Sequence, residues 1–196
     1  MKRSLIFLLF ALLPLWTFAQ QTYKIAPQSS LTVSGTSTMH DWSMTSNALQ
    51  GQLQLLVENG QLQAVEQVQL KLPAESLKSG KDAMDKNAYK ALNTGKHANI
   101  SFELLQIKSL EQTAAGTKVI ALGKLTINGQ TKTETIEVVA KTDAKGSLSL
   151  TGSKSFKMST YGVEPPSFMF GSVTTGDAVT VSINLLLSPG TKLVNQ

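Results

Sequence analysis

Apolar and polar residues alternate along most of the chain that follows the first twenty residues. The segment 178–188 shows this most clearly, because aliphatic side chains occupy every odd position from Val179 to Leu187 and mostly polar ones lie between them. The segments 147–158 and 62–73 repeat the pattern. Successive side chains of a β-strand point to opposite faces, so this alternation predicts antiparallel strands with one apolar face and one face in water.

The alternating segments are separated by residues that favour tight turns. Asn59-Gly60 and Asn128-Gly129 each supply a pair that accepts the positive φ angles of a two-residue hairpin, and Asp143-Ala144-Lys145-Gly146 is a looser turn. Eight strands joined mostly by short turns favour an all-β fold, an eight-stranded antiparallel barrel without exposed edges, over a sandwich of two sheets. The expected strands are residues 22–36, 43–57, 62–73, 98–108, 117–128, 131–142, 147–158 and 178–188.

One segment, residues 81–96, departs from the twofold alternation and predicts a short helical insertion. Met84, Ala88 and Leu92 lie four positions apart, which places them on one face of a helix. Asp82 is placed to cap or charge the start of that helix. The pattern is equally consistent with a movable lid over one opening of the barrel and with a fixed plug of its core.

The N-terminus has the three parts of a secretory signal peptide. Two basic residues precede an almost unbroken apolar run from Leu5 to Trp16, and Thr17-Phe18-Ala19 places small residues where a signal peptidase requires them. The run is too short for a comfortable membrane crossing, which disfavours an uncleaved anchor. We therefore expect residues 1–19 to be removed by cleavage near Ala19, residues 20–196 to form a single barrel domain, and the product to be periplasmic or secreted.

The composition excludes several classes of partner. The chain contains no cysteine, which rules out disulfides, thiolate chemistry and bacterial lipoprotein attachment. Its 18 Lys and Arg residues, against 13 Asp and Glu residues, are spread along the chain without a basic run, so we expect no nucleic acid partner. The mild positive charge is compatible with transient contact with an anionic membrane surface. The sequence does not indicate an oligomeric state.

No catalytic or metal-binding constellation is apparent. Zinc sites need three or four ligands, and His40 and His97 are too far apart in the sequence to form a recognisable ligand spacing. There is no Gly-x-Ser-x-Gly nucleophile motif and no Gly-x-Gly-x-x-Gly phosphate loop. We therefore expect no enzyme activity, no catalytic residue, no metal and no cofactor; a turnover that depended on His40 would contradict this.

The interior is expected to be apolar and incompletely filled. Aromatic residues make up only 6% of the chain, and the small residues Gly123, Ala140 and Gly152 fall within expected strands. An eight-stranded barrel is wide enough either to be filled by side chains or to hold one small ligand. Small residues favour the second arrangement, although glycines also mark barrel bends. In the loop 161–171, the Phe168-Met169-Phe170 run fits either a cap on the core or an apolar rim at the cavity mouth.

Several short segments form a recognisable set when they are read together in chain order. They are Val33-Ser34-Gly35-Thr36-Ser37-Thr38-Met39-His40-Asp41-Trp42, Gly80-Lys81-x-x-Met84-Asp85-x-x-x-Tyr89-x-Ala91-Leu92, Ile100-Ser101-Phe102, Gly123-Lys124-Leu125-Thr126-Ile127-Asn128-Gly129, and Pro165-Pro166 with Met169-Phe170-Gly171. The set spans essentially the whole chain after the signal peptide. It resembles the YceI-like family of exported barrels, in the branch common in Bacteroidetes.

The resemblance implies an eight-stranded, lipocalin-like barrel with a helical insertion and an apolar lumen that binds a polyisoprenoid or quinone-like lipid without catalysis. Two segments depart from the family pattern. His97-Ala98 stands where the family usually has an aromatic residue or histidine followed by proline, and Asp82-Ala83-Met84-Asp85 replaces an Asp-x-His-Leu motif of many relatives. Both departures lie beside the helical insertion, so a polar head-group contact at that place does not carry over from the family to this chain.

Strand parity and family position together select the side chains expected to line the lumen and contact an isoprenoid or similar amphiphile. Each of them also has a purely structural interpretation, which is packing of the core. The alternative function is a stress-related scaffold or interaction protein with a packed barrel, no bound lipid and an exposed apolar patch. The ligand-binding candidates are Trp42, Leu53, Leu55, Leu70, Leu72, Met84, Leu92, Ile100, Phe102, Leu125, Ile127, Phe156, Met158, Phe168 and Phe170.

Overall fold

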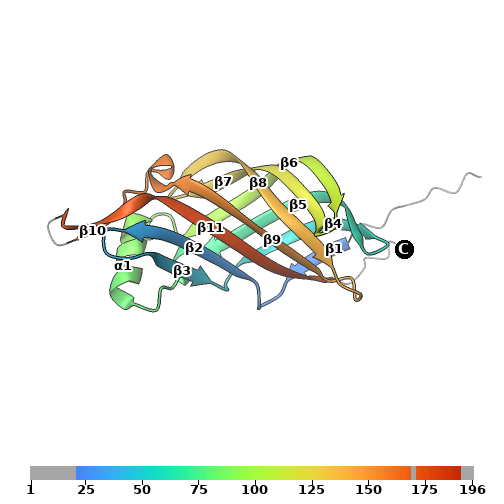
Figure 1. Ribbon diagram of the computed structural model, residues 1–196, viewed down its shortest axis with the longest axis horizontal. Coiled ribbons are helices and arrows are strands. Elements are labelled where there is room, and N and C mark those ends of the chain that lie inside the picture. Colours follow the sequence, from blue (N-terminus) through green and yellow to red (C-terminus); the bar gives the residue numbers. More distant parts are fainter. Residues whose placement is uncertain (1–20, 169–170, 191–196) are drawn as a thin grey trace, which may run out of the picture.

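The strands form an antiparallel barrel with a helix across one end (Figure 1). The computed structural model describes residues 21–168 and 171–190, so the predicted signal peptide lies outside the described residues. The helical segments are η1 (Ala74–Ser76), α1 (Asp82–Ala91) and η2 (Met158–Tyr161). The strands are β1 (Gln21–Ile25), β2 (Ser30–Ser37), β3 (Trp42–Ser46), β4 (Gln50–Glu58), β5 (Gln61–Pro73), β6 (Asn99–Thr113), β7 (Gly116–Ile127), β8 (Gln130–Thr142), β9 (Leu148–Lys157), β10 (Ser167–Phe168) and β11 (Val173–Pro189).

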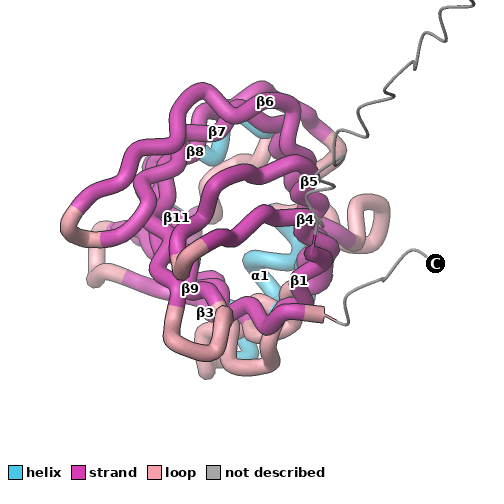
Figure 2. Tube along the Cα trace, turned by 90° about the vertical axis from the view of Figure 1, so that its right-hand side faces the viewer, coloured by secondary structure: helices cyan, strands magenta, loops and turns pink. Residues whose placement is uncertain are grey.

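The barrel closes as an eight-stranded ring, which confirms the predicted fold class. Neighbouring strands follow the order β1-β4-β5-β6-β7-β8-β9-β11, and β11 returns to β1 through pairs such as Ile25 with Leu187. β2 follows β1 along the same partner, β11, and β3 pairs with β2 before the chain enters β4. β1 and β2 together therefore correspond to the predicted strand 22–36, and β3 and β4 together correspond to the predicted strand 43–57. Figure 2 looks into the ring of strands and shows α1 within its outline.

The first predicted strand, residues 22–36, is wrong in one respect, because it is interrupted at residues 26–29. Pro27 has no backbone N–H with which to continue a strand ladder. Ser29 is fully buried, and its hydroxyl takes the place of a backbone partner. It donates to the carbonyl of Leu186 at 3.2 Å and accepts from the N–H of Leu186 at 2.9 Å. The chain can therefore bend here while β11 keeps its hydrogen bonds.

Three further strand boundaries differ from the prediction. The second predicted strand is broken at residues 47–49, where the Asn47 side chain donates to the carbonyl of Ser29 at 2.9 Å. β6 continues to Thr113 rather than ending at 108, since the sequence after 108 contains none of the Gly, Pro or Asn residues that mark turns until the hairpin itself. β11 begins at Val173 rather than at 178, because its first residues pair with β10.

Both Asn-Gly pairs form the tight hairpins that the sequence predicts. The φ angles are 50° at Asn59 and 74° at Gly60, and 49° at Asn128 and 71° at Gly129. Two consecutive positive φ angles are the requirement of a type I′ turn, whose twist matches that of the flanking strands. The second turn fixes the register of β7 with β8 along the whole pair, whereas the register of β4 with β5 shifts at two irregularities after the first turn.

The helical insertion is shorter than the predicted 81–96, because α1 ends at Ala91 and residues 92–96 form turns. α1 lies at the end of the barrel opposite the β4–β5 hairpin (Figure 1). Tyr89 ties it to the segment after β5, since its hydroxyl donates to the carbonyls of Glu75 and Leu77, both at 2.8 Å. Thr94 adds a 2.7 Å hydrogen bond from its hydroxyl to the Glu75 carboxylate. The insertion is therefore anchored at several points.

The best-packed part of the core lies at the hairpin end of the barrel. Tyr23, Leu55, Leu62, Leu148 and Leu187 are all at most 2% exposed. They belong to the β1–β11 junction and to the strand ends that flank the β4–β5 and β8–β9 hairpins. This end of the barrel is thus filled by side chains, and unfilled space begins farther toward α1.

No helix among the described residues is long and apolar enough to cross a membrane.

Candidate ligand-binding cavity

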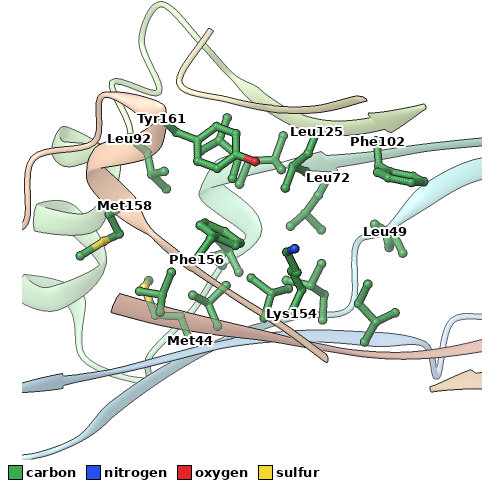
Figure 3. Close-up of a pocket in the computed structure, with 18 of the residues that line it drawn as sticks. Met44, Leu49, Leu72, Leu92, Phe102, Leu125, Lys154, Phe156, Met158 and Tyr161 are labelled. Atoms are coloured by element: carbon green, nitrogen blue, oxygen red, sulfur yellow. The ribbon is translucent and has the colours of Figure 1, made fainter. Parts of the chain in front are cut away.

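A cavity of about 520 Å³ occupies the barrel lumen. Its wall consists of inward-facing side chains from strands around the ring and of one face of α1, and most of these side chains are aliphatic or aromatic (Figure 3). Small-molecule sites usually have volumes of about 300–1,000 Å³ and predominantly apolar walls. The lumen therefore has the size and the chemistry of a site for one apolar or amphiphilic molecule.

Every candidate whose side chain the structure describes lines this cavity. Phe170 and the side chain of Phe168 lie outside the described part of the chain, so their position at the rim stays a prediction. The contact of the others with a ligand also stays a prediction, since only their place in the wall is seen. The lining candidates are Trp42, Leu53, Leu55, Leu70, Leu72, Met84, Leu92, Ile100, Phe102, Leu125, Ile127, Phe156 and Met158.

Some of these side chains also belong to the packed core. Leu53, Leu55 and Leu72 are each 1% exposed and join the main hydrophobic cluster. Ile100 and Leu125, in contrast, are only partly buried and pack against the core from its edge. The first group therefore contributes to core packing as well as to the wall, and the second group has more exposed surface.

The small strand residues are not the cause of the cavity, which corrects the reasoning from the sequence. None of Gly123, Ala140 and Gly152 lines it. A Cβ atom on Gly123 would collide with the ring of Phe102, so that ring lies against the glycine backbone and fills the space. A Cβ atom on Gly152 would collide with the carbonyl of Glu137, because β8 and β9 approach each other closely there.

A polar cluster inside the barrel was missed by the sequence reasoning. Lys154 and Tyr161 line the cavity, and their polar ends face its interior in Figure 3. Lys154 Nζ lies 2.9 Å from Glu134 Oε2, and the Tyr161 hydroxyl donates to Glu134 Oε1 at 3.0 Å. Lys154 shares the even, inward parity of Leu150 and Phe156 along β9. A charged residue at an inward position was the signal that could have revealed the cluster.

The cluster lies just beyond the end of a strand ladder. β8 and β9 pair from Thr142–Leu148 as far as Val138–Gly152, so Glu134 and Lys154 lie beyond the paired part of these strands. The ion pair joins the two strands there through side chains.

Tyr161 completes this part of the wall from η2, which follows β9 directly. It is 0% exposed, and its ring meets that of Phe156 edge to face with 5.2 Å between centroids. The Asn128 side chain holds the same segment by donating to the carbonyl of Gly162 at 2.9 Å.

Burial is the main reason that the pKa of Tyr161 is raised far above its ordinary value, and the hydrogen bond to Glu134 and its negative charge add to the shift. The phenol is therefore protonated at neutral pH and acts as a hydrogen-bond donor. Because one ammonium and one carboxylate face each other beside it, the formal charges of the cluster cancel.

The cavity reaches solvent at the α1 end of the barrel. Met39, in the loop between β2 and β3, lines the cavity although it is 69% exposed. His40, Lys81 and Pro166 line the same region. Trp42 stands just inside, and its indole N–H donates to the carbonyl of Thr36 at 3.0 Å. This arrangement gives an entrance between the β2–β3 loop, the start of α1 and the segment that follows η2.

The two histidines do not form a site together with acidic or nucleophilic groups in the described hydrogen-bond network. His40 Nδ1 lies 2.8 Å from the carbonyl of its neighbour Asp41. The ring of His97 occupies the place where a side chain on Gly129 would lie. Over residues 21–168 and 171–190, no three histidine or acidic side chains are grouped so that they could hold a metal ion.

Comparison with solved structures supports the fold. BcnA of Burkholderia cenocepacia superposes with a TM-score of 0.69 at 16% identity, over 84% of this chain and 99% of that chain. A polyisoprenoid-binding domain from Saccharophagus degradans, described as implicated in plant cell wall breakdown, gives a TM-score of 0.61 at 14% identity, over 86% and 98%. The YCEI protein of Campylobacter jejuni gives 0.53 at 15% identity, over 65% and 74%.

A comparison with curated protein sequences found no match. The sequence does match a family model, that of the YceI-like domain, over residues 19–187. This match includes α1, every residue of the cavity wall and all eight strands of the ring except the last two residues of β11. The chain therefore belongs to the YceI-like domain family.

Proposed function

We propose that this protein is a non-catalytic, exported lipid-binding protein that holds an isoprenoid or a similar amphiphile in the barrel lumen. The observation that carries the proposal is the apolar cavity of about 520 Å³, which is open at the α1 end. Burial of apolar surface stabilises a complex by roughly 25 cal/mol per Å². A long hydrocarbon chain in this lumen would therefore gain affinity from the wall without a charged anchor.

The comparisons support the ligand class without fixing its identity. The structural neighbour from Saccharophagus degradans is a polyisoprenoid-binding domain. An isoprenoid chain is flexible, branched and apolar, which suits a wall of leucine, isoleucine, valine and methionine side chains. A polyisoprenoid or a quinone-like lipid is the ligand we propose, and the binding role needs no catalytic residue and no cofactor.

The alternative function, a scaffold with a packed barrel, has less support from the structure. A scaffold of that kind should have a filled interior and a contiguous apolar surface patch. The interior contains a cavity, and the large hydrophobic residues that are exposed in the described chain are Met39 and Leu105. Met39 belongs to the cavity entrance, so its exposure is explained by the binding role.

Native mass spectrometry of the purified protein, followed by organic extraction, tests the proposal. We expect an adduct that releases an apolar lipid on extraction, or uptake of an added prenyl lipid by the empty protein. Ala121→Phe places a ring in the lumen and should abolish uptake, whereas Ala178→Phe adds the same ring to the exposed side of β11 and should leave it unchanged. Failure of the wild type to take up any prenyl lipid would refute the proposal.

Export to the periplasm or to the medium is part of the same proposal. It rests on the apolar run and on the small residues that end at Ala19. The mature protein should begin at Gln20, which the mass of the exported product would reveal. Ala19→Arg replaces the small residue before the cleavage site and should cause the precursor to accumulate in the cell.

A further inference from the structure

The polar cluster of Lys154, Glu134 and Tyr161 lies part of the way down an otherwise apolar cavity. Lys154 is opposite Val181 of β11, and the lining residues of that strand extend from Val173 to Leu185. Apolar side chains therefore lie on both sides of the ammonium, Phe156 toward α1 and Leu150 toward the hairpin end. The cluster therefore lies inside the cavity and not at its entrance.

The fold itself gives little reason for an ion pair at this place. Transfer of two charges from water into an apolar interior is costly, and well-packed hydrophobic residues in their place are often neutral or stabilising. Lys154 and Glu134 keep 30% and 16% of their side-chain surface exposed, and Lys154 lines the lumen. An inward lysine on a strand whose other inward residues are apolar or glycine thus calls for a functional explanation.

The cluster has unused hydrogen-bonding capacity toward the cavity. An ammonium carries three N–H donors, and within the described residues the polar partner of Lys154 is Glu134 alone. The Tyr161 hydroxyl gives its proton to Glu134 and has no exposed surface, so it holds the carboxylate in place and does not itself meet a ligand. A ligand oxygen beside Lys154 would therefore meet a free N–H donor on the exposed part of that side chain.

We propose that Lys154, held in place by Glu134 and through it by Tyr161, forms a subsite for the uncharged, oxygen-bearing head group of the lipid. The inference deepens the proposed function and rests on it. Because the charges of Lys154 and Glu134 cancel, the subsite matches a hydroxyl or carbonyl group and not a phosphate, whose charge would require an excess of positive charge. The ligand is thus an amphiphile bound with its polar end inside the barrel.

Three probes with one hydrocarbon chain test the head-group preference: farnesol, farnesyl phosphate and farnesene. Their affinities can be compared by displacement of the fluorescent probe N-phenylnaphthylamine from the lumen. We expect the wild type to bind farnesol about tenfold more tightly than farnesene, and farnesyl phosphate more weakly than farnesol. Equal affinity for all three probes, or a preference for the phosphate, would overturn the subsite while leaving lipid binding intact.

Two charge variants with matched controls assign the preference to these residues. Lys154→Met should lower the affinity for farnesol until it equals the affinity for farnesene. Lys124→Met, on the exposed side of β7, should change neither of these two affinities. Glu134→Gln leaves the ammonium uncompensated and should shift the preference toward farnesyl phosphate by about tenfold. Glu137→Gln, on the exposed side of β8, which also carries Glu134, should leave the preference unchanged. Unchanged selectivity in Lys154→Met and Glu134→Gln would overturn the inference.

A double variant separates binding from folding. Lys154→Met with Glu134→Gln removes both charges and keeps an oxygen that can accept from Tyr161. It should unfold at nearly the wild-type temperature, bind farnesene as before and lose the preference for farnesol. Loss of the folded state in this variant would assign the cluster a structural role and contradict the inference. If the wild type binds none of the three probes, the proposed function fails together with the subsite.

Discussion

The buried carboxylate of Asp85 on α1 accepts two hydrogen bonds from Ser79, one from the hydroxyl at 2.7 Å and one from the backbone N–H at 2.8 Å. Asp85 is 5% exposed, and it is the one charged residue that is fully buried in the described chain. Lys78 Nζ lies 3.7 Å from its other oxygen. The pair joins the first turn of α1 to the segment before it, at the edge of the cavity entrance.

Replacement of Asp85 by alanine should destabilise the protein by about 1–3 kcal/mol, because the two Ser79 donors lose their acceptor in a buried place. Asp82→Ala is the matched control, since it removes an exposed acidic residue from the same helical turn. Urea unfolding at neutral pH measures both effects. Equal losses in the two variants would show that the contact with Ser79 contributes nothing beyond the charge near the helix start.

The stabilisation by Asp85 should depend on pH. The Ser79 hydroxyl first, and its backbone N–H second, lower the pKa of Asp85 below its ordinary value of 3.8. The unfolded chain therefore takes up the proton before the folded one, so the contribution is present above pH 3.8 and is lost as pH falls through the lowered pKa. The difference in unfolding free energy between wild type and Asp85→Ala should shrink in this range, and a constant difference would contradict the prediction.

The raised pKa of Tyr161 predicts that the free energy of unfolding depends on pH in the opposite direction at alkaline pH. Its pKa is raised by burial above the ordinary value of 10.0, so the folded protein keeps a proton that the unfolded chain releases. The free energy of unfolding should therefore fall as pH rises above 10.0. Burial also raises the pKa of Tyr23, so Tyr161→Phe should reduce the slope without removing it. An unchanged slope in denaturation measured across this pH range would refute the assignment.

The contact between Gly123 and the ring of Phe102 links packing to the cavity. Gly123→Ala should destabilise the barrel by about 1–3 kcal/mol, because the ring must move away from the new methyl group. Phe102 lines the lumen, so the displaced ring should also reduce lipid uptake. Gly95→Ala is the control, since no atom lies within 4 Å of the place that its new methyl group would take. Adding Phe102→Leu to Gly123→Ala should restore stability; an additive double variant would mean that the two residues do not interact.

Hydrogen exchange on α1 decides between a movable lid and a fixed plug. The Tyr89 hydroxyl, with its two carbonyl partners, and the Asp85–Ser79 contact favour a fixed element. We expect the amides of residues 82–91 to be protected in the empty protein and little changed by added lipid. Tyr89→Phe should speed their exchange without changing that of the strands. Rapid exchange in the empty wild type, slowed by lipid, would establish a lid.

The sequence by itself determined the local elements of this protein. The alternation from Val179 to Leu187 predicts a half-buried strand because each position specifies its own face, and Asn128-Gly129 predicts its hairpin because both residues accept a positive φ. These properties depend on neighbours a few positions away. Strand parity together with the family resemblance predicts Phe156 and Leu125 as wall residues, and both line the lumen.

Only the tertiary structure decided which distant residues meet, because barrel closure and strand register bring together side chains that alternation alone leaves unrelated. The Ser29 hydroxyl could replace a strand partner only once β11 had placed Leu186 beside it. The space beside Gly123 is filled by the ring of Phe102 from the neighbouring strand, a contact that the position of the glycine in the sequence does not reveal. Glu134 and Lys154 became a polar cluster because β8 and β9 are neighbours in the barrel and bring the two side chains to within 2.9 Å of each other.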